Sequence, residues 1–220
     1  VEKADQGSER TLYEELSHAR PGWGFLMEEA GEIEGDPGKP RFIVDPLDGT
    51  QNFLHAIPQF AISIAVQEPK LGGGWGDITS SLIYQPITDE SYWAERGRGA
   101  WLHDRRLRVS SRRHLHECLI GTGIPSMGRG DMAEWGRIFG AIAPEVAGIR
   151  RFGASSLDLA WVAAGRYDGF WEGQLDVWDV AAGMLLVREA GGFGSDYRGG
   201  DRAIERKEVI AGSGAVHSKL

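Results

Sequence analysis

The segment Val44–Phe53, VDPLDGTQNF, constrains the fold most, because it sets two carboxylates directly behind a short apolar run. The run RFIVD, residues 41–45, has the length and composition of a buried strand that ends in Asp45. Asp48 follows within a turn rich in Pro and Gly, and ligands of open α/β sheets collect at the carboxyl ends of such strands. Two interpretations fit this pattern equally well: a ligand site, or a plain turn in which Asp48 caps a short helix.

The remaining sequence predicts layers of sheets and helices. A helix is expected over Ser8–Ala19 with Ser8 as its cap, followed by several runs of strand length. From about residue 110 strands and helices alternate, and no linker rich in Gly, Pro or Ser interrupts the chain. We therefore expect one α/β domain over residues 1–220, an α+β layered sandwich. Residues 1–109 would form a mainly antiparallel half with a helix, and residues 110–220 a βα half.

Composition excludes several classes of function. The net charge of −8, from 32 acidic and 24 basic residues, disfavours nucleic acid as a partner. The sequence shows no signal-peptide pattern and no apolar run of membrane length, so we expect neither a signal peptide nor a membrane partner. The single cysteine, Cys118, cannot form an internal disulfide, and a reducing, cytoplasmic location follows. The six histidines lack the spacing of a zinc site.

Four acidic residues stand at element boundaries: Glu28, Asp45, Asp48 and Asp179. Asp179 precedes an apolar helix, where a plain N-cap is the simpler interpretation. Carboxylates that converge repel one another unless one is protonated or a cation lies between them, and oxygen ligands select a hard ion such as Mg²⁺. A helix beginning at residues 48–50 would also offer free N–H groups to a phosphate. Together these features suit metal-assisted hydrolysis of a phosphate ester by water.

Two motifs resemble the magnesium-dependent, lithium-sensitive inositol monophosphatase family. They are DPLDGTQNFLHAIPQFAISIAV, residues 45–66, and WDVAAGMLLVREAGG, residues 178–192, and GFLMEEAGE upstream supports them. The similarity runs over nearly the whole chain. It implies the alternating helix and sheet layers shared by inositol monophosphatases and fructose bisphosphatases.

The resemblance also implies roles for particular residues. Two or three Mg²⁺ ions would be bound. Their ligands would be Glu28, Asp45, Asp48, Asp179 and the carbonyl oxygen of Leu47. Asp5, Glu28 and Thr50 would form the catalytic group, with Asp5 and Thr50 orienting the attacking water. The substrate would contact Asp48, Gly49, Thr50, Gly153, Ala154, Ser155 and Glu172.

The activity implied is hydrolysis of myo-inositol monophosphate to inositol and phosphate, with a small phosphate ester as the partner molecule and a homodimer as the assembly. The alternatives within the superfamily are phosphatases for 3′-phosphoadenosine 5′-phosphate, fructose 1,6-bisphosphate or histidinol phosphate. A regulatory binding protein that keeps the fold is the alternative outside enzymes. The sequence GTQNF behind Asp48 resembles the inositol branch.

Overall fold

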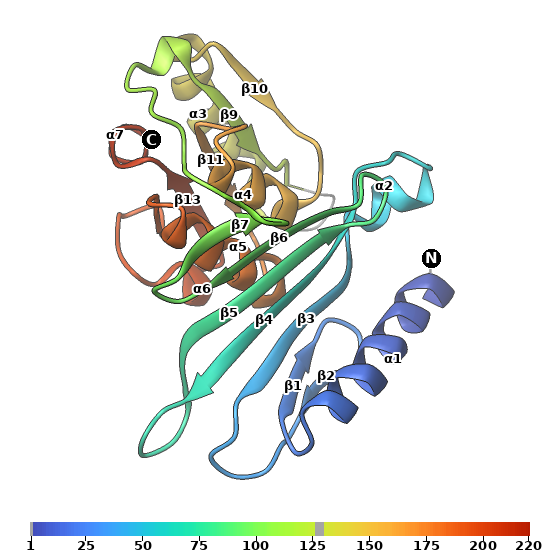
Figure 1. Cartoon of the computed structure of the whole chain (residues 1–220). Coiled ribbons are helices and arrows are strands. Elements are labelled where there is room, and N and C mark those ends of the chain that lie inside the picture. The colour runs from blue at the N-terminus through green and yellow to red at the C-terminus, as the bar shows by residue number, and fades with distance from the viewer. Residues whose placement is uncertain (1, 126–129) are drawn as a thin grey trace.

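Two sheets with helices between and around them form the molecule, as Figure 1 shows. The computed structural model describes residues 2–125 and 130–220. This layered α/β arrangement confirms the fold class that the sequence predicts. The helices are α1 (Glu2–Ala19), α2 (Thr50–Leu54), α3 (Met132–Ile142), α4 (Ser155–Ala163), α5 (Val177–Glu189), α6 (Ala203–Arg206) and α7 (Gly214–His217), with 3₁₀ turns at Leu115–Glu117 and Ala143–Glu145.

The larger sheet has eight strands in the order β2-β1-β3-β4-β5-β6-β7-β8. All neighbours in it are antiparallel except β1 and β3, which run parallel. Its strands are β1 (Gly24–Met27), β2 (Gly31–Ile33), β3 (Arg41–Asp48), β4 (Ala61–Pro69), β5 (Trp75–Gln85), β6 (Glu90–Glu95), β7 (Gly99–Leu102) and β8 (Arg105–Arg106).

The smaller sheet has five strands in the order β10-β9-β11-β13-β12. It is mixed, because β9 pairs in parallel with β10 and β11, while β13 pairs antiparallel with β11 and β12. Its strands are β9 (Leu119–Thr122), β10 (Gly148–Arg150), β11 (Gly169–Gly173), β12 (Phe193–Ser195) and β13 (Glu208–Gly212).

Helices α4 and α5 fill the space between the two sheets (Figure 1). They are apolar almost all round, as expected of helices covered on every side. Gly183 of α5 lets the pair approach closely, since a Cβ there would lie 2.4 Å from the Cβ of Leu159 in α4. The resulting core joins side chains of both sheets with those of α4 and α5.

Strand β3 is longer than the sequence predicts, and the prediction that it ends at Asp45 is wrong. Asp45 pairs with Ser63 and Asp48 with Ala61, so the register shifts between the two aspartates. Pro46 lies in this irregular stretch, where its missing N–H costs the ladder no hydrogen bond. Both aspartates thus lie on a buried strand, and between them β3 advances three residues while β4 advances two.

Helix α1 begins at Glu2, so the predicted start at Ser8 is also wrong. Ser8 lies inside the helix, and its hydroxyl donates to the carbonyl oxygen of Pro46 at 2.9 Å. Leu12 and Leu16 of α1 pack against β1 and β3, as the spacing of apolar residues predicts. Within the described residues, no helix combines the length and the apolar character that crossing a bilayer requires.

Candidate active site

The four boundary acids meet where β1, β3 and α5 come together. Asp45 and Asp48 are 1% and 8% exposed on β3. Glu28 directly follows β1, whose parallel pairing with β3 places it beside Asp45, and its backbone N–H donates to the carbonyl oxygen of Val44 at 3.3 Å. The N-terminus of α5 is tied to the same place, because Ser63 donates its hydroxyl to the carbonyl oxygen of Trp178 at 3.2 Å. The structure thus brings together residues that are far apart in sequence.

Each of these carboxyl groups has a raised pKa. Burial is the main cause for Asp45, and the negative charges of Asp48, Glu28 and Asp179 add to it. Burial and the charge of Asp48 raise the pKa of Asp179 to about 8. Burial also raises the pKa of Glu28, although its hydrogen bond to Asp45 opposes this. These groups therefore hold their protons more tightly than isolated carboxyl groups do, and positive charge brought to them would oppose the shift.

Asp48 holds the N-terminus of α4. Its Oδ2 accepts hydrogen bonds from the Ser156 hydroxyl and from the Ser156 backbone N–H, the latter at 2.8 Å. The N-cap residue of α4, Ala154, has no side chain that can cap the helix, and the Asp48 carboxyl group accepts from the helix N-terminus instead. The possibility that Asp48 caps the short helix behind it is wrong, because the N-cap of α2 is Gly49. Nothing in the sequence pointed to Ser156 as the partner of Asp48.

Gly49 and Thr50 make a tight turn between β3 and α2. Gly49 has φ of 89°, and a Cβ there would lie 2.8 Å from the carbonyl oxygen of Gln59. The Thr50 hydroxyl donates to the carbonyl oxygen of Leu47 at 3.0 Å. Two groups assigned by resemblance, the Thr50 hydroxyl and the Leu47 carbonyl, are therefore in direct contact. A carbonyl oxygen has two lone pairs, so this bond leaves Leu47 able to bind a cation.

Replacing Gly49 with Ala is expected to lower the free energy of unfolding by about 1–3 kcal/mol, through left-handed strain together with the clash at Gln59. Denaturant unfolding measures this effect. Gly38→Ala is the matched control, because Gly38 has φ of 79° and open space around it. Gly38→Ala should show the strain alone. Equal losses in the two variants would mean that the close approach at Gly49 contributes nothing.

Asn52 ties this turn to the residues before α4. The side chain is 7% exposed, and its Nδ2 donates to the carbonyl oxygens of Gln59 at 2.7 Å and Phe152 at 2.6 Å. It thereby fixes the start of the predicted substrate-binding stretch, Gly153–Ser155. Sequence reasoning missed Asn52, although a polar residue at a buried position inside the first motif was the available signal.

Glu172 lies at the end of β11 and faces Ser155. The Ser155 hydroxyl donates to Glu172 Oε2 at 3.1 Å. Burial raises the pKa of Glu172 to about 7, and the charge of Asp48 contributes while the bond from Ser155 opposes it. A carboxyl group in this state can either donate to or accept from a hydroxyl group of a ligand.

Asp5 reaches the site from α1. It is 6% exposed and its Oδ1 has no hydrogen-bond partner among the described residues. Burial raises its pKa first, and the charge of Glu29 raises it further. The helix is fixed by the Ser8 bond to β3 and by Glu9, whose Oε2 accepts from the backbone N–H of Glu29 at 3.0 Å. Asp5 is thus held near the turn that carries Glu28.

The N-cap of α5 is Asp176, so the simpler interpretation of Asp179 as the cap is wrong. Asp179 occupies the third helical position, and its Oδ2 accepts from the backbone N–H of Asp176 at 2.7 Å. The two aspartates form a capping box, in which the side chain of each accepts a hydrogen bond from the backbone N–H of the other. Asp176 also pairs with Lys207 at 2.6 Å, whereas Asp179 lies nearer the other acids and feels the charges of Asp48 and Glu28.

The donor set suits a hard divalent cation. It consists of carboxylate oxygens and a backbone carbonyl, the ligands that Mg²⁺ prefers. The raised pKa values of the acids and the unpartnered Asp5 Oδ1 are both relieved by positive charge. Among the described residues, no three Asp, Glu, His or Cys side chains already surround one point as ligands. Asp48 and Asp179 instead turn an oxygen toward backbone N–H groups at helix starts.

Comparison with known proteins gives a consistent result. A profile of the inositol monophosphatase family matches residues 1–220. An inositol-1-monophosphatase of Rhizobium meliloti is 52% identical over 220 residues, covering 100% of this chain and 80% of the relative. The Nus factor SuhB of Pseudomonas aeruginosa is 43% identical over 217 residues, covering 97% and 78%. The crystal structure of extragenic suppressor protein suhB from Bartonella henselae superposes with a TM-score of 0.92 at 51% identity, covering 98% and 80%.

Proposed function

The chain belongs to the inositol monophosphatase family, and from this premise we propose that it is a Mg²⁺-dependent phosphatase that hydrolyses myo-inositol monophosphate to inositol and phosphate. The observation that carries the proposal is the meeting of Glu28, Asp45, Asp48 and Asp179, each with a raised pKa. Such a set is costly to the fold unless a cation uses it.

Two or three Mg²⁺ ions would be held by these acids, with the Leu47 carbonyl oxygen as a further ligand. When bound, the cation lowers the pKa of water and offsets negative charge on the phosphate and the leaving oxygen. Asp45 would be shared between ions, and its electrostatic coupling to each of the other three acids supports this role.

The chain's own groups would position the reactants. Asp5 Oδ1, which is buried and has no hydrogen-bond partner among the described residues, would accept a hydrogen bond from the attacking water. The Thr50 hydroxyl would orient the same water after exchanging its bond to Leu47. Backbone N–H groups of Gly49 and Thr50 would bind the phosphate oxygens. Ring hydroxyl groups would bond to Glu172 and to Gly153, Ala154 and Ser155.

A regulatory role is the second candidate, because relatives of 43% and 42% identity carry the names Nus factor SuhB and putative Nus factor SuhB. In that case the fold would serve to bind a partner. Binding alone gives no reason to keep four acids together, two of them buried, so we rank catalysis first. Assembly as a homodimer, lithium sensitivity and a cytoplasmic location complete the proposal.

The assay that tests the function measures phosphate released by the purified protein in millimolar Mg²⁺, in EDTA, and with Li⁺ added. We expect Mg²⁺-dependent, Li⁺-inhibited turnover of inositol 1-phosphate, in preference to adenosine 3′,5′-bisphosphate, fructose 1,6-bisphosphate and histidinol phosphate. Preference for one of the other esters would keep the metal site and change the substrate. Silence on every ester would favour the regulatory role.

A further inference from the structure

The position of Glu172 depends on a glycine in the neighbouring strand. A Cβ on Gly123 would lie 1.8 Å from Glu172 Oε1, so the carboxyl group occupies the space that a side chain would need. Gly123 directly follows β9, which pairs in parallel with β11, the strand that carries Glu172. Ser155 bonds to one carboxyl oxygen, and the Gly123 backbone backs the group on another side.

The Gly123 peptide is itself fixed by two donors. Trp135 Nε1 donates to the Gly123 carbonyl oxygen at 2.7 Å, and the Thr122 hydroxyl donates to it at 3.0 Å. The Trp135 ring stacks on Phe139 of the same helix, with ring centroids 5.0 Å apart. Helix α3 begins in a defined place because Asp131 accepts from the backbone N–H groups of Ala133 and Glu134. Stacking on Phe139 therefore fixes the Trp135 indole, and the indole N–H in turn fixes the Gly123 peptide.

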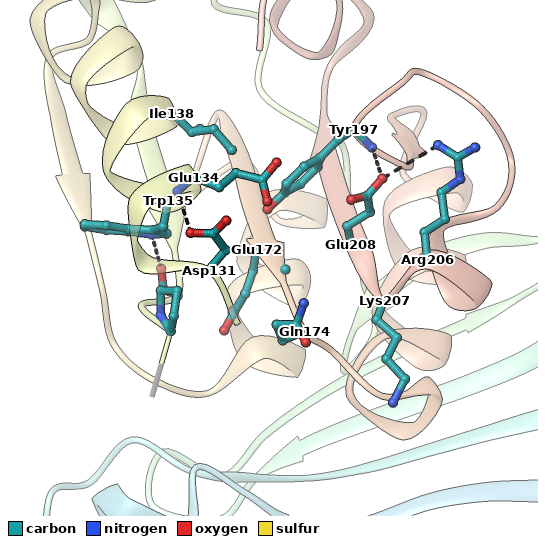
Figure 2. A pocket seen from close by; sticks show the side chains of 13 residues that line it. Asp131, Glu134, Trp135, Ile138, Glu172, Gln174, Tyr197, Arg206, Lys207 and Glu208 are labelled. Atoms are coloured by element: carbon teal, nitrogen blue, oxygen red, sulfur yellow. Dashed lines mark hydrogen bonds and ion pairs between the residues drawn. The ribbon is translucent and has the colours of Figure 1, made fainter. Parts of the chain in front are cut away.

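Among residues 2–125 and 130–220, packing is incomplete beside Glu172 on the side toward α3. A cavity of about 50 Å³ lies there, and Glu172 and Trp135 both line it, as Figure 2 shows. This volume admits a few water molecules, since one water needs roughly 10–15 Å³. Because the space is hollow, the carboxyl group can shift if the Gly123 backbone moves.

We propose that Trp135 is a positioning residue for Glu172 and thereby sets the affinity for the hydroxyl-bearing half of the substrate. The inference rests on the proposed function, in which Glu172 bonds to a polyol. Trp135 acts through the Gly123 peptide and touches neither the phosphate nor the boundary acids. Its removal changes recognition of the alcohol and leaves the phosphate chemistry as it was.

The test is Trp135→Phe, which removes the N–H donor and keeps a ring to stack on Phe139. The KM for inositol 1-phosphate is expected to rise about 3–10-fold, the value of one hydrogen bond, while kcat changes little. Hydrolysis of 4-nitrophenyl phosphate, which has no ring hydroxyl groups, should keep its kcat/KM. Trp135→His, which retains a ring N–H, should recover most of the affinity.

The matched control is Trp93→Phe, because Trp93 Nε1 donates to the carbonyl oxygen of His103 at 2.8 Å on the other sheet. That variant should leave KM unchanged. In a Glu172→Ala background, Trp135→Phe should have no further effect on KM, since the residue acts through Glu172. An undiminished effect in that background, or equal losses on both esters, overturns the inference. Absence of any phosphatase activity in the unmodified protein would instead count against the proposed function.

Discussion

Asp45→Asn is expected to abolish turnover of inositol 1-phosphate, with a loss of about 10³-fold or more, equivalent to roughly 4 kcal/mol of barrier. The variant removes the acid that lies among Glu28, Asp48 and Asp179 and that we propose the cations share. It also removes a charge from a buried position, 1% exposed, where burial and three negative neighbours oppose ionisation. In EDTA at pH 8 the free energy of unfolding should therefore rise, by about 1.4 kcal/mol for each unit of pKa shift relieved.

Opposite signs for activity and stability separate a catalytic loss from misfolding. Phosphate release gives the first quantity and denaturant unfolding gives the second. Asp158→Asn is the matched control, because Asp158 is also 1% exposed and burial raises its pKa well above the ordinary value. That variant should gain stability at pH 8 and keep its activity within a few-fold. If Asp45→Asn retained most of the turnover, the site as drawn would be wrong.

The second large effect is on stability against pH in the absence of divalent cations. Each acid with a raised pKa binds more protons in the folded chain than in the unfolded one, so the free energy of unfolding falls as pH rises. Asp179, with a pKa of about 8, and Glu172, with a pKa of about 7, place this loss between about pH 4 and pH 8. We expect a fall on the order of 1 kcal/mol per pH unit or more from pH 6 to pH 8.

Urea unfolding in EDTA at several pH values measures this slope. Burial lowers the pKa of His217, which works in the opposite sense, but a single histidine is outweighed by the several acids with raised pKa values. Asp179→Asn should make the curve flatter, whereas Asp77→Asn, at an exposed ion pair, should not. Added Mg²⁺ should restore stability at pH 8, because the cation takes the place of the retained protons. A curve that rises toward pH 8 in EDTA would contradict the clustering of the acids.

The sequence predicted the elements whose pattern is local. The layered α/β class and the alternation of strands and helices after residue 110 follow from apolar runs separated by helical segments, and both are present. The family was likewise evident from two motifs, and the family profile confirms it. The prediction that the boundary acids converge came from the position of each acid at the end of an element. In the structure, Glu28, Asp45, Asp48 and Asp179 lie close enough to raise one another's pKa values.

The errors arose where the deciding interaction is not local. The extension of β3 to Asp48 depends on pairing with β4, and Pro46 gave a turn signal that the bulge overrides. The early start of α1 places Ser8 against β3, a contact that a capping rule cannot foresee. In the same way, the bonds of Ser156 to Asp48 and of Asn52 to Phe152 join residues about one hundred positions apart, and no spacing in the sequence indicates them.

Those long connections have a consequence for how the protein becomes active. The bonds that define the site span 108 residues from Asp48 to Ser156, 100 from Asn52 to Phe152 and 115 from Ser63 to Trp178. Closing loops of this length costs entropy before the contacts repay it, so such pairings come late in folding. During synthesis the ribosome must release most of the chain before Asp48 meets its partner. Asp179 can therefore join Glu28, Asp45 and Asp48 only after α5 has been made and packed against the larger sheet, so an unfinished chain carries an incomplete set of acids.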